Sequence, residues 1–281
     1  MNKPQWITAG IAILILIGLY AATQDKLFGP TPIKKQSFQT AKQAEFPTDS
    51  VLFYAKQKLS PEQVTRLNFL EHSISRGDVK DQQIHVYHQL ARFWVDSARV
   101  FAPYAWYTAQ AARLENSEKS LTFAAHLFLE NLKEEANPQL RQWEASQAKE
   151  LFERSLSINP ANDSSKVGLG AAMVFGGTAM PMEAITKIRE VAEKDSTHIY
   201  AQMTLGEASL MSGQLEKAFE RFSKVARMKP DHLEAIFRAA ETAEQMGKNK
   251  EAALWYGKLL PHINNAEMKK EVEARIARLN K

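Results

Sequence analysis

The chain opens with a run of uncharged, mainly apolar residues and then changes to amphipathic segments. Residues 6–22, WITAGIAILILIGLYAA, contain no charged side chain. As an α-helix this run would be about 25 Å long, near the lower limit for crossing a bilayer. A signal-peptide cleavage site needs a small residue three positions before the cut, where this run offers Tyr20 or Leu19. The pattern predicts an uncleaved transmembrane anchor over residues 1–23, with a cleaved signal peptide as the alternative.

From Ser60 onward, apolar residues recur with helical spacing and are interrupted by glycine, proline and asparagine. SPEQ at 60–63 is typical of a helix start, because serine can cap the first turn and proline fits within it. RGD at 76–78 is explained by a turn between two helices, without an integrin-like partner. Further helices are expected over about 79–99, 103–115, 118–135 and 139–158. No run of alternating β-branched residues stands out, so the fold class predicted is all-α.

Residues 24–58 lack this periodicity. Prolines and Gly29 stand among lysine, glutamine and threonine, which is typical of a flexible linker. This segment contains six lysines and three acidic residues, so the predicted linker is basic. The alternative is that its lysines contact anionic lipid headgroups.

The charge of the chain is unevenly distributed. The formal net charge is +4, but residues 59–281 hold 29 basic and 29 acidic side chains. A neutral body lacks the cationic surplus that a duplex-binding domain uses against phosphates, so no nucleic-acid partner is expected. The chain has no cysteine, which excludes disulfides, thiolate metal sites and a cysteine nucleophile.

The C-terminal half repeats itself at an interval of 34 residues. This interval separates Gly213 from Gly247, Ala218 from Ala252 and Phe222 from Tyr256. Together with Leu205, Gly206 and Pro230, these residues resemble the tetratricopeptide repeat (TPR) family. The resemblance implies helix–turn–helix units with small residues where two helices touch, an aromatic wedge on the second helix, and a terminal proline.

The preceding segment fits the same register. Leu169, Gly170, Gly177 and Ala184 match the repeat, with two extra residues in the turn TAMPM. We therefore expect an α-solenoid behind a single N-terminal transmembrane helix. Its expected parts are degenerate helical repeats over 59–160, three TPR repeats over 161–264 and a capping helix over 265–281. The pairing of the helix at 139–158, with the helix before it or after it, is left open.

The stretch VGLGAAMVFGG at 167–177 could instead suggest a phosphate-binding loop. A dinucleotide fingerprint needs G-x-G-x-x-G after a strand, but Met173 occupies the third glycine position. No nucleotide is expected. Gly168 and Gly176 have no role in the repeat, and each costs up to about 1 kcal/mol within a helix. Residues 163–184 are therefore expected to be the least stable repeat.

No catalytic motif is present, so we expect no enzyme and no cofactor. His85 and His88 are three residues apart on one helix, a spacing that can hold a metal, but the sequence indicates no third ligand. As an alternative function, the aromatic-rich region 60–135 could form a small-molecule pocket. Its candidate residues are Phe93, Trp94, Phe101, Tyr104, Trp106 and Tyr107.

The resemblance also implies a partner groove lined by the first helices. Its expected positions are Val167, Ala171, Val174, Tyr200, Met203, Glu207, Leu210, Phe237 and Glu241. The basic residues with which some members of the family grip a terminal carboxylate are absent; Arg238 is the one cation near these positions. An apolar or basic helix or extended segment is therefore the expected ligand.

These features together suggest a protein-interaction scaffold in a membrane or envelope complex, such as an accessory of a translocon, secretion or biogenesis machine. It resembles in plan the single-pass bacterial proteins that carry such repeats beside the protein-export channel. We expect the body on the periplasmic side of a bacterial inner membrane. The lysines after the apolar run favour the cytoplasmic side as the alternative.

Overall fold

The computed structural model describes residues 47–75, 79–177 and 181–281, which belong to one compact unit spanning Glu45–Lys281. The expected anchor at 6–22, most of the expected linker and the RGD tripeptide lie outside these residues. None of the helices described here is long and apolar enough to cross a membrane.

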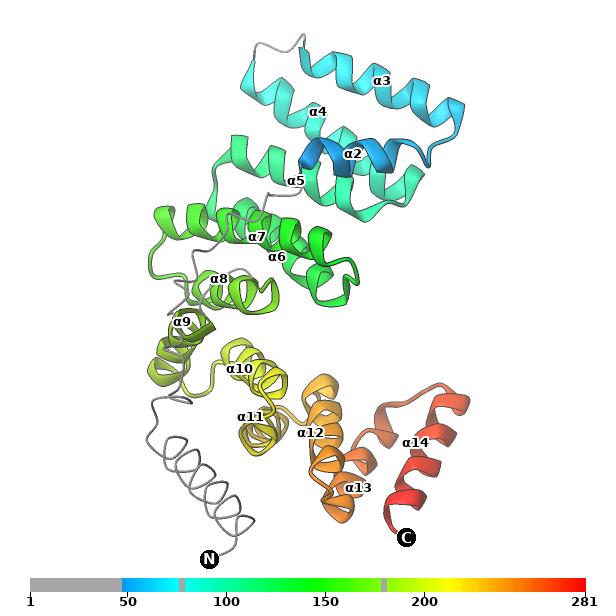
Figure 1. The fold of residues 1–281 in the computed structure, drawn as a ribbon, viewed down its shortest axis with the longest axis vertical. Coiled ribbons are helices and arrows are strands. Elements are labelled where there is room, and N and C mark those ends of the chain that lie inside the picture. Colours follow the sequence, from blue (N-terminus) through cyan, green and yellow to red (C-terminus); the bar gives the residue numbers. More distant parts are fainter. Residues whose placement is uncertain (1–46, 76–78, 178–180) are drawn as a thin grey trace, which may run out of the picture. The chain divides into compact units, whose positions relative to one another are not determined.

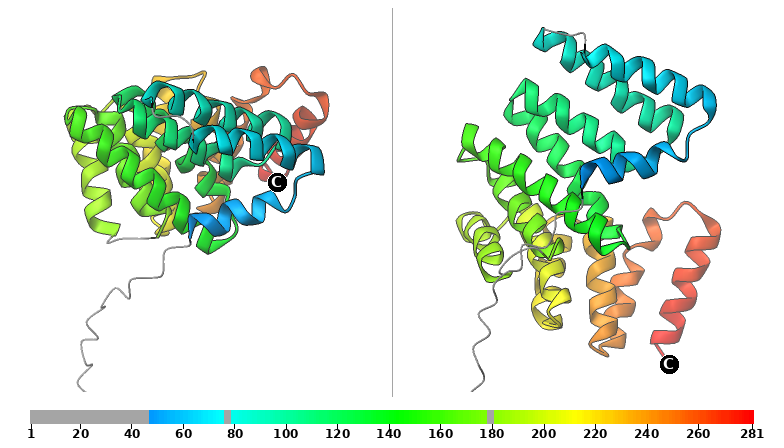
Figure 2. Two further views of the ribbon diagram at one scale, coloured as in Figure 1. Left: turned by 90° about the horizontal axis from the view of Figure 1, so that it is seen from above. Right: turned by 45° about the horizontal axis from the view of Figure 1, so that its top comes forward.

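The described part is helical throughout and contains no strand. From α3 onward each α-helix packs on the next along the chain, whereas α2 packs on α5 (Figures 1 and 2). This arrangement confirms the prediction of an all-α solenoid. The elements are α2 (Thr48–Lys56), α3 (Pro61–Ser75), α4 (Lys80–Arg92), the π-helical η1 (Phe93–Ala98), α5 (Phe101–Glu115), α6 (Glu118–Glu134), α7 (Pro138–Ile158), α8 (Asp163–Phe175), α9 (Pro181–Lys194), α10 (Ile199–Met211), α11 (Leu215–Met228), α12 (Leu233–Gln245), α13 (Asn249–Gly257), the 3₁₀ turn η2 (Leu260–His262) and α14 (Ala266–Leu279).

Three consecutive helix pairs, α8/α9, α10/α11 and α12/α13, begin in the same way. The residue before each first helix, Asn162, His198 or His232, accepts a hydrogen bond from the backbone N–H three residues later, at 2.9, 3.2 and 3.2 Å. Such a cap satisfies one of the free N–H groups at a helix start. The repeat is therefore built into the turns as well as into the helices.

The turn inside each of these pairs contains a glycine with left-handed backbone geometry. Gly177, Gly213 and Gly247 have φ values of +64°, +70° and +72°, which other residues adopt only with strain. The next helix begins two residues after Gly213 and Gly247 but four after Gly177. The two-residue insertion predicted in the first turn is confirmed.

Small residues allow the helices of a pair to approach. A Cβ atom added at Gly206 would lie 2.5 Å from Phe222 Cε1, and one at Gly170 would lie 2.5 Å from Ile188 Cγ1. Phe222 and Ala218 are fully buried. The predicted contact between a glycine on the first helix and an aromatic wedge on the second is confirmed for α10 and α11.

The structure contradicts the prediction that Gly168 and Gly176 have no packing role. A Cβ atom at Gly168 would lie 2.3 Å from Phe152 Cζ, and one at Gly176 would lie 2.1 Å from Ala145 Cβ. Both neighbours belong to α7, so these glycines allow α8 to approach the preceding pair while Gly170 allows it to approach α9. The helix-propensity cost of these two glycines is therefore accompanied by close packing, and the low stability of the repeat at 163–184 stays a prediction.

The substitution Gly168→Ala tests this correction through the sign of its effect. If the glycine had no packing role, alanine would stabilise the helix by about 1 kcal/mol. Because Phe152 is fully buried and cannot swing into solvent, we expect a net loss of about 1–2 kcal/mol from overpacking. Urea denaturation measures the change. Gly257→Ala is the control, since a Cβ atom there meets nothing within 4 Å, and it should be neutral or stabilising.

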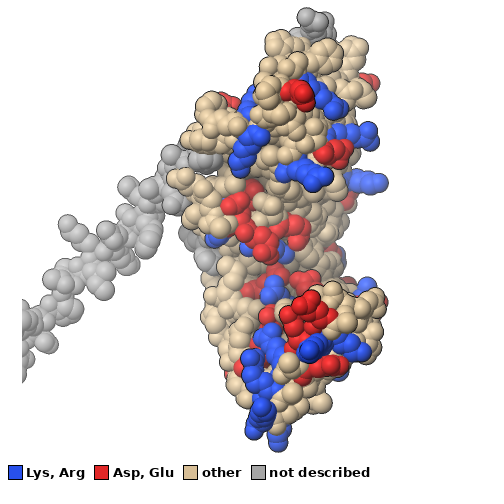
Figure 3. All heavy atoms as spheres, turned by 90° about the vertical axis from the view of Figure 1, so that its right-hand side faces the viewer, with Lys and Arg blue, Asp and Glu red and all other residues tan. Residues whose placement is uncertain are grey.

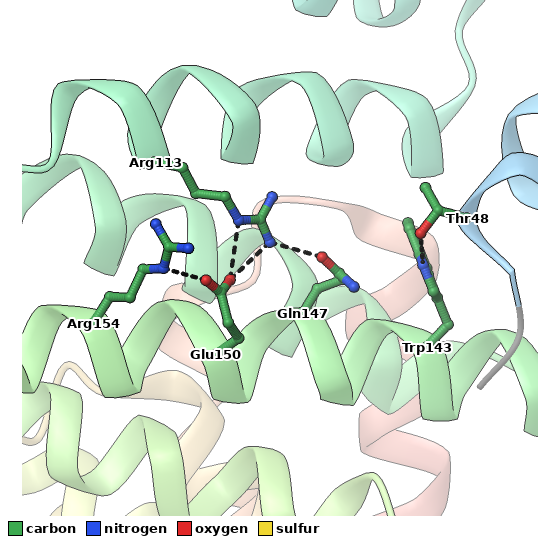
Figure 4. Close-up of polar contacts among 6 residues, drawn as sticks. All are labelled: Thr48, Arg113, Trp143, Gln147, Glu150 and Arg154. Atoms are coloured by element: carbon green, nitrogen blue, oxygen red, sulfur yellow. Dashed lines mark hydrogen bonds and ion pairs between the residues drawn. The ribbon is translucent and has the colours of Figure 1, made fainter. Parts of the chain in front are cut away.

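Part of the segment expected to be a flexible linker belongs to the folded body. Residues 48–56 form α2, whose Val51 and Ala55 are buried. Trp143 Nε1 on α7 donates to Thr48 Oγ1 at 3.0 Å (Figure 4). The prediction missed this helix because its apolar positions cover only two turns, and its packing partner is 95 residues away.

The helices at the N-terminal end differ from their predicted bounds in two places. The helix expected over 79–99 is regular to Arg92, continues as the π-helical η1 and stops at Arg99, which has φ +55°. The next helix begins at Phe101 and contains Pro103 in its first turn, where a missing N–H costs nothing. The open question of pairing is resolved because α7 packs more extensively on α6 than on α8.

An ion-pair network joins α5 to α7. Arg113 Nη2 donates to Glu150 Oε2 and to Gln147 Oε1, both at 2.8 Å, and Arg154 pairs with the same glutamate (Figure 4). The two elements are separated by α6 in sequence, so this network fixes one helix pair against the next.

Candidate functional site

Three adjoining hollows run along the surface from α4 to α12. The first has a volume of about 680 Å³ and lies between α4, α5 and α6. The second, about 400 Å³, lies along α6, and the third, about 370 Å³, lies between α6, α8, α10 and α12. Phe123 lines both the first and the second, and Glu134 lines both the second and the third. The three hollows therefore adjoin one another at shared residues, and we call them together the groove.

The middle of the groove contains a partly buried histidine. The ring of His126 on α6 lies 5.1 Å from that of Phe152 and 5.5 Å from that of Tyr200 on α10. Burial lowers the pKa of His126, and nearby Lys133 acts in the same direction, while Glu130 opposes them. His126 therefore favours its neutral form, which suits contact with the apolar part of a ligand.

The C-terminal end of the groove combines an apolar floor with charged walls. Phe175, Leu210 and Met211 line it together with Glu207 and Lys133. Lys133 Nζ lies 3.5 Å from Glu207 Oε2 and 5.4 Å from the centre of the Phe175 ring. This lysine links a carboxylate on α10 with an aromatic ring on α8.

Glu207 is an incompletely compensated carboxylate. Burial raises its pKa, and Glu234 adds to the shift, whereas Lys133 and Arg238 oppose it. Because burial outweighs both cations, a further positive charge from a ligand would stabilise the ionised form. The space-filling view shows acidic side chains gathered near the middle of one face (Figure 3).

The structure distributes the nine expected groove residues over several environments. Glu207 and Leu210 line the groove. Phe237 is exposed, Glu241 is partly exposed, Tyr200 is half-buried against His126, and Val174 lines a further cavity near α9. Val167, Ala171 and Met203 are buried, with 0%, 1% and 7% exposure. These last three cannot contact a partner, because neighbouring helices already cover them.

In the second and third hollows, the groove residues that sequence reasoning missed lie mainly on α6. They include Phe123, His126, Leu127, Glu130, Lys133 and Glu134, joined by Arg141 on α7 and Phe175 on α8. The first hollow is lined mostly by residues of α4 and α5. The residues of α6 were missed because the sequence did not show whether the helix at 139–158 pairs with the helix before it or after it. Once that helix is taken as the second of a pair, the helix before it becomes a first helix and lines the groove.

The alternative sites in the N-terminal region are not assembled as expected. Three of the six aromatic candidates belong to the core: Phe93, Trp94 and Tyr107. The other three are partly buried and pack against the core: Phe101, Tyr104 and Trp106. Of the six, only Tyr104 lines the first hollow. His88 Nε2 lies 2.8 Å from Glu115 Oε1, whereas His85 contacts Gln89. Within the described ranges, no three His, Asp or Glu side chains approach closely enough to hold a metal ion.

Comparison with known proteins identifies the fold. No family model matches the chain, and no curated protein matches it. Among solved structures, a tetratricopeptide repeat protein from Parabacteroides merdae ATCC 43184 aligns with 83% of this chain and 90% of its own, at 13% identity and a TM-score of 0.51. YrrB, a TPR protein described as having an unusual peptide-binding site, aligns with 73% of this chain and 97% of its own, at 15% identity and a TM-score of 0.42. MamA 41-end from Desulfovibrio magneticus RS-1 aligns with 66% and 95%, at 19% identity and a TM-score of 0.44. The first likeness shows that the helices have a TPR-like solenoid fold.

Proposed function

We propose that this protein is an interaction scaffold that holds a segment of a partner protein in the groove. The observation that carries the proposal is the succession of three adjoining hollows, which share Phe123 and Glu134. A row of adjoining hollows across several helix pairs suits an extended or helical segment, which can make contacts in each hollow in turn.

The lining of the groove favours a segment with apolar and basic side chains. Phe123 is 55% exposed, and it stands where two hollows meet. Glu134 occupies the next junction, and Glu207 lies beyond it. An apolar side chain would be buried against the ring, and lysine or arginine would pair with the carboxylates.

We further propose that residues 6–22 anchor this scaffold in a bacterial inner membrane, with the folded body on the periplasmic side. The uncharged run supports this proposal. Anchoring would raise the effective concentration of the groove near membrane-bound partners. A reporter enzyme that works only outside the cytoplasm, fused after Lys281, should be active in cells. An inactive but intact fusion would contradict the periplasmic orientation.

The double substitution Phe123→Asp/Glu134→Lys tests the groove itself. Both side chains are exposed, so we expect folding to be preserved and co-purification of the partner from solubilised membranes to fall at least tenfold. The reason is that the variant removes the apolar contact and reverses one charge. Circular dichroism and a melting curve verify the fold.

The matched control is Leu254→Asp/Glu271→Lys, which makes the same chemical changes at exposed positions of α13 and α14 outside the groove. It should leave co-purification unchanged. Equal capture by the groove variant and the wild type, with both folded, would contradict the proposed function.

A further inference from the structure

A further cavity of about 460 Å³ lies between α9 and α11, is also lined by α10, and shares Met211 with the third hollow of the groove. Its apolar lining includes Val174, Ile185, Leu205 and Met211. Three cationic residues also line it, namely Arg189, Lys217 and Arg221. Ile185 and Arg189 are one turn apart on α9, and Lys217 and Arg221 are one turn apart on α11. The two helices therefore present cations to the same space, and none of the described residues that line it is acidic.

Among the described residues, the three cations have no anionic partner. Lys217 Nζ donates to Gln214 Oε1 at 2.7 Å, and Arg221 Nη1 donates to Gln202 Oε1 at 2.8 Å, so both contacts are to neutral amides. None of the three forms an ion pair with the part of the chain that the structure describes. Burial lowers the pKa of Arg221, nearby Arg189 adds to the shift, and Glu220 opposes it. Two guanidinium groups on facing helices thus repel each other.

A buried glutamine side chain holds the guanidinium group of Arg221 in place. Gln202, which accepts its hydrogen bond, is only 4% exposed, and its Nε2 donates to the Ser196 carbonyl at 3.0 Å. A guanidinium held in one orientation loses little entropy when it binds an anion. The cationic side of the cavity is therefore organised before any ligand arrives.

From this arrangement we propose that the cavity binds a small anionic amphiphile, a carboxylate or phosphate head group carrying an alkyl chain. The head group would lie between Arg189, Lys217 and Arg221, where it would offset their repulsion. The alkyl chain of the ligand would lie against Ile185, Leu205 and Val174. The volume is within the range of small-molecule sites, and the apolar lining distinguishes this ligand from a free inorganic anion.

Photoaffinity labelling tests this proposal on the full chain in phosphatidylcholine nanodiscs. The probe is decanoate carrying a diazirine near the end of its chain, and labelled residues are mapped by mass spectrometry. We expect the label on α9 and α10 beside the cavity. An excess of decanoate or decyl phosphate should suppress it at least tenfold, and their relative strength distinguishes the carboxylate from the phosphate.

Two further competitors separate the head group from the chain. Decanol has the chain alone and inorganic phosphate has the anion alone, so neither should compete at the same concentration. Competition by decanol equal to that of decanoate would show a merely apolar cavity, and competition by inorganic phosphate would show a merely anionic site. Either result would overturn the proposal, as would label spread evenly over the chain.

The variant Arg189→Gln/Lys217→Gln removes two cations whose side chains are exposed, so the fold should be preserved. Labelling of the cavity should fall at least tenfold. Lys224→Gln/Arg227→Gln removes two cations from α11 that do not line the cavity, and it should label like the wild type. Undiminished labelling of the first variant would contradict the assignment.

Discussion

Replacing Glu144 with glutamine should raise the free energy of unfolding by several kcal/mol at pH 8–9 and by much less at pH 5. Glu144 on α7 is fully buried. Asn131 Nδ2 donates to its Oε1 at 2.7 Å, while its Oε2 finds no hydrogen-bond partner among the described residues. Burial raises the pKa of this carboxyl from 4.5 to about 8, Glu135 adds to the shift, and Asn131 opposes it.

The sign of the pH dependence follows from proton binding. Between pH 4.5 and 8 the folded state keeps the proton on Glu144, whereas the unfolded state releases it. The free energy of unfolding therefore falls as pH rises through this window. The shift corresponds to roughly 5 kcal/mol as an upper limit. Glutamine keeps the acceptor for Asn131 and has no charge to bury, so this loss disappears.

Urea denaturation of both proteins at several pH values between 5 and 9 measures the effect. The control is Glu153→Gln, on the same helix but with a side chain that is 53% exposed. It should change the free energy of unfolding by less than about 0.5 kcal/mol at every pH. Parallel pH profiles for Glu144→Gln and the wild type would contradict a protonated, buried Glu144.

The second large effect is expected at the aromatic wedge of the α10/α11 pair. Phe222→Ala should destabilise the protein by about 3–5 kcal/mol, because the ring is fully buried and its removal leaves a cavity beside Gly206. Phe237→Ala serves as the control, since that ring is 38% exposed, and its cost should be clearly smaller. Thermal and urea unfolding give both values.

A double-mutant cycle shows whether glycine and ring depend on each other. Gly206→Ala alone should cost about 1–3 kcal/mol, because its new Cβ atom meets the Phe222 ring. In the Phe222→Ala background the same change should be neutral or stabilising, since the space is then free. Additive effects would show that the close approach of Gly206 and Phe222 does not determine this contact.

The sequence alone was sufficient to predict the structure at positions where a residue type has one structural use. Gly177, Gly213 and Gly247 marked the turns correctly because their left-handed backbone excludes most other residues. Phe222 and Gly206 marked a helix contact because a large ring needs a missing side chain opposite it. Such local requirements recur at a fixed interval, which made the helix pairs readable without a structure.

The sequence alone was insufficient to predict the structure where packing depends on residues far apart along the chain. Gly168 has its partner on α7 and not in its own pair, so the internal pattern of a repeat could not explain it. Met203 fits a groove by register, but neighbouring helices bury it. The contribution of α6 to the groove depends on how α7 pairs, and α2 is fixed by Trp143 far along the chain. These arrangements follow from the stacking of pairs.

The most direct test of the groove as a binding site is site-specific photo-crosslinking in intact cells. A photoreactive amino acid is placed at Phe123, Glu134 or Leu210, which line successive parts of the groove. Control positions are Leu254 and Met268, which are exposed on α13 and α14. We predict that all three groove positions crosslink to the same protein and that neither control does. Crosslinks to that protein from the controls, or its absence from every groove position, would contradict the account.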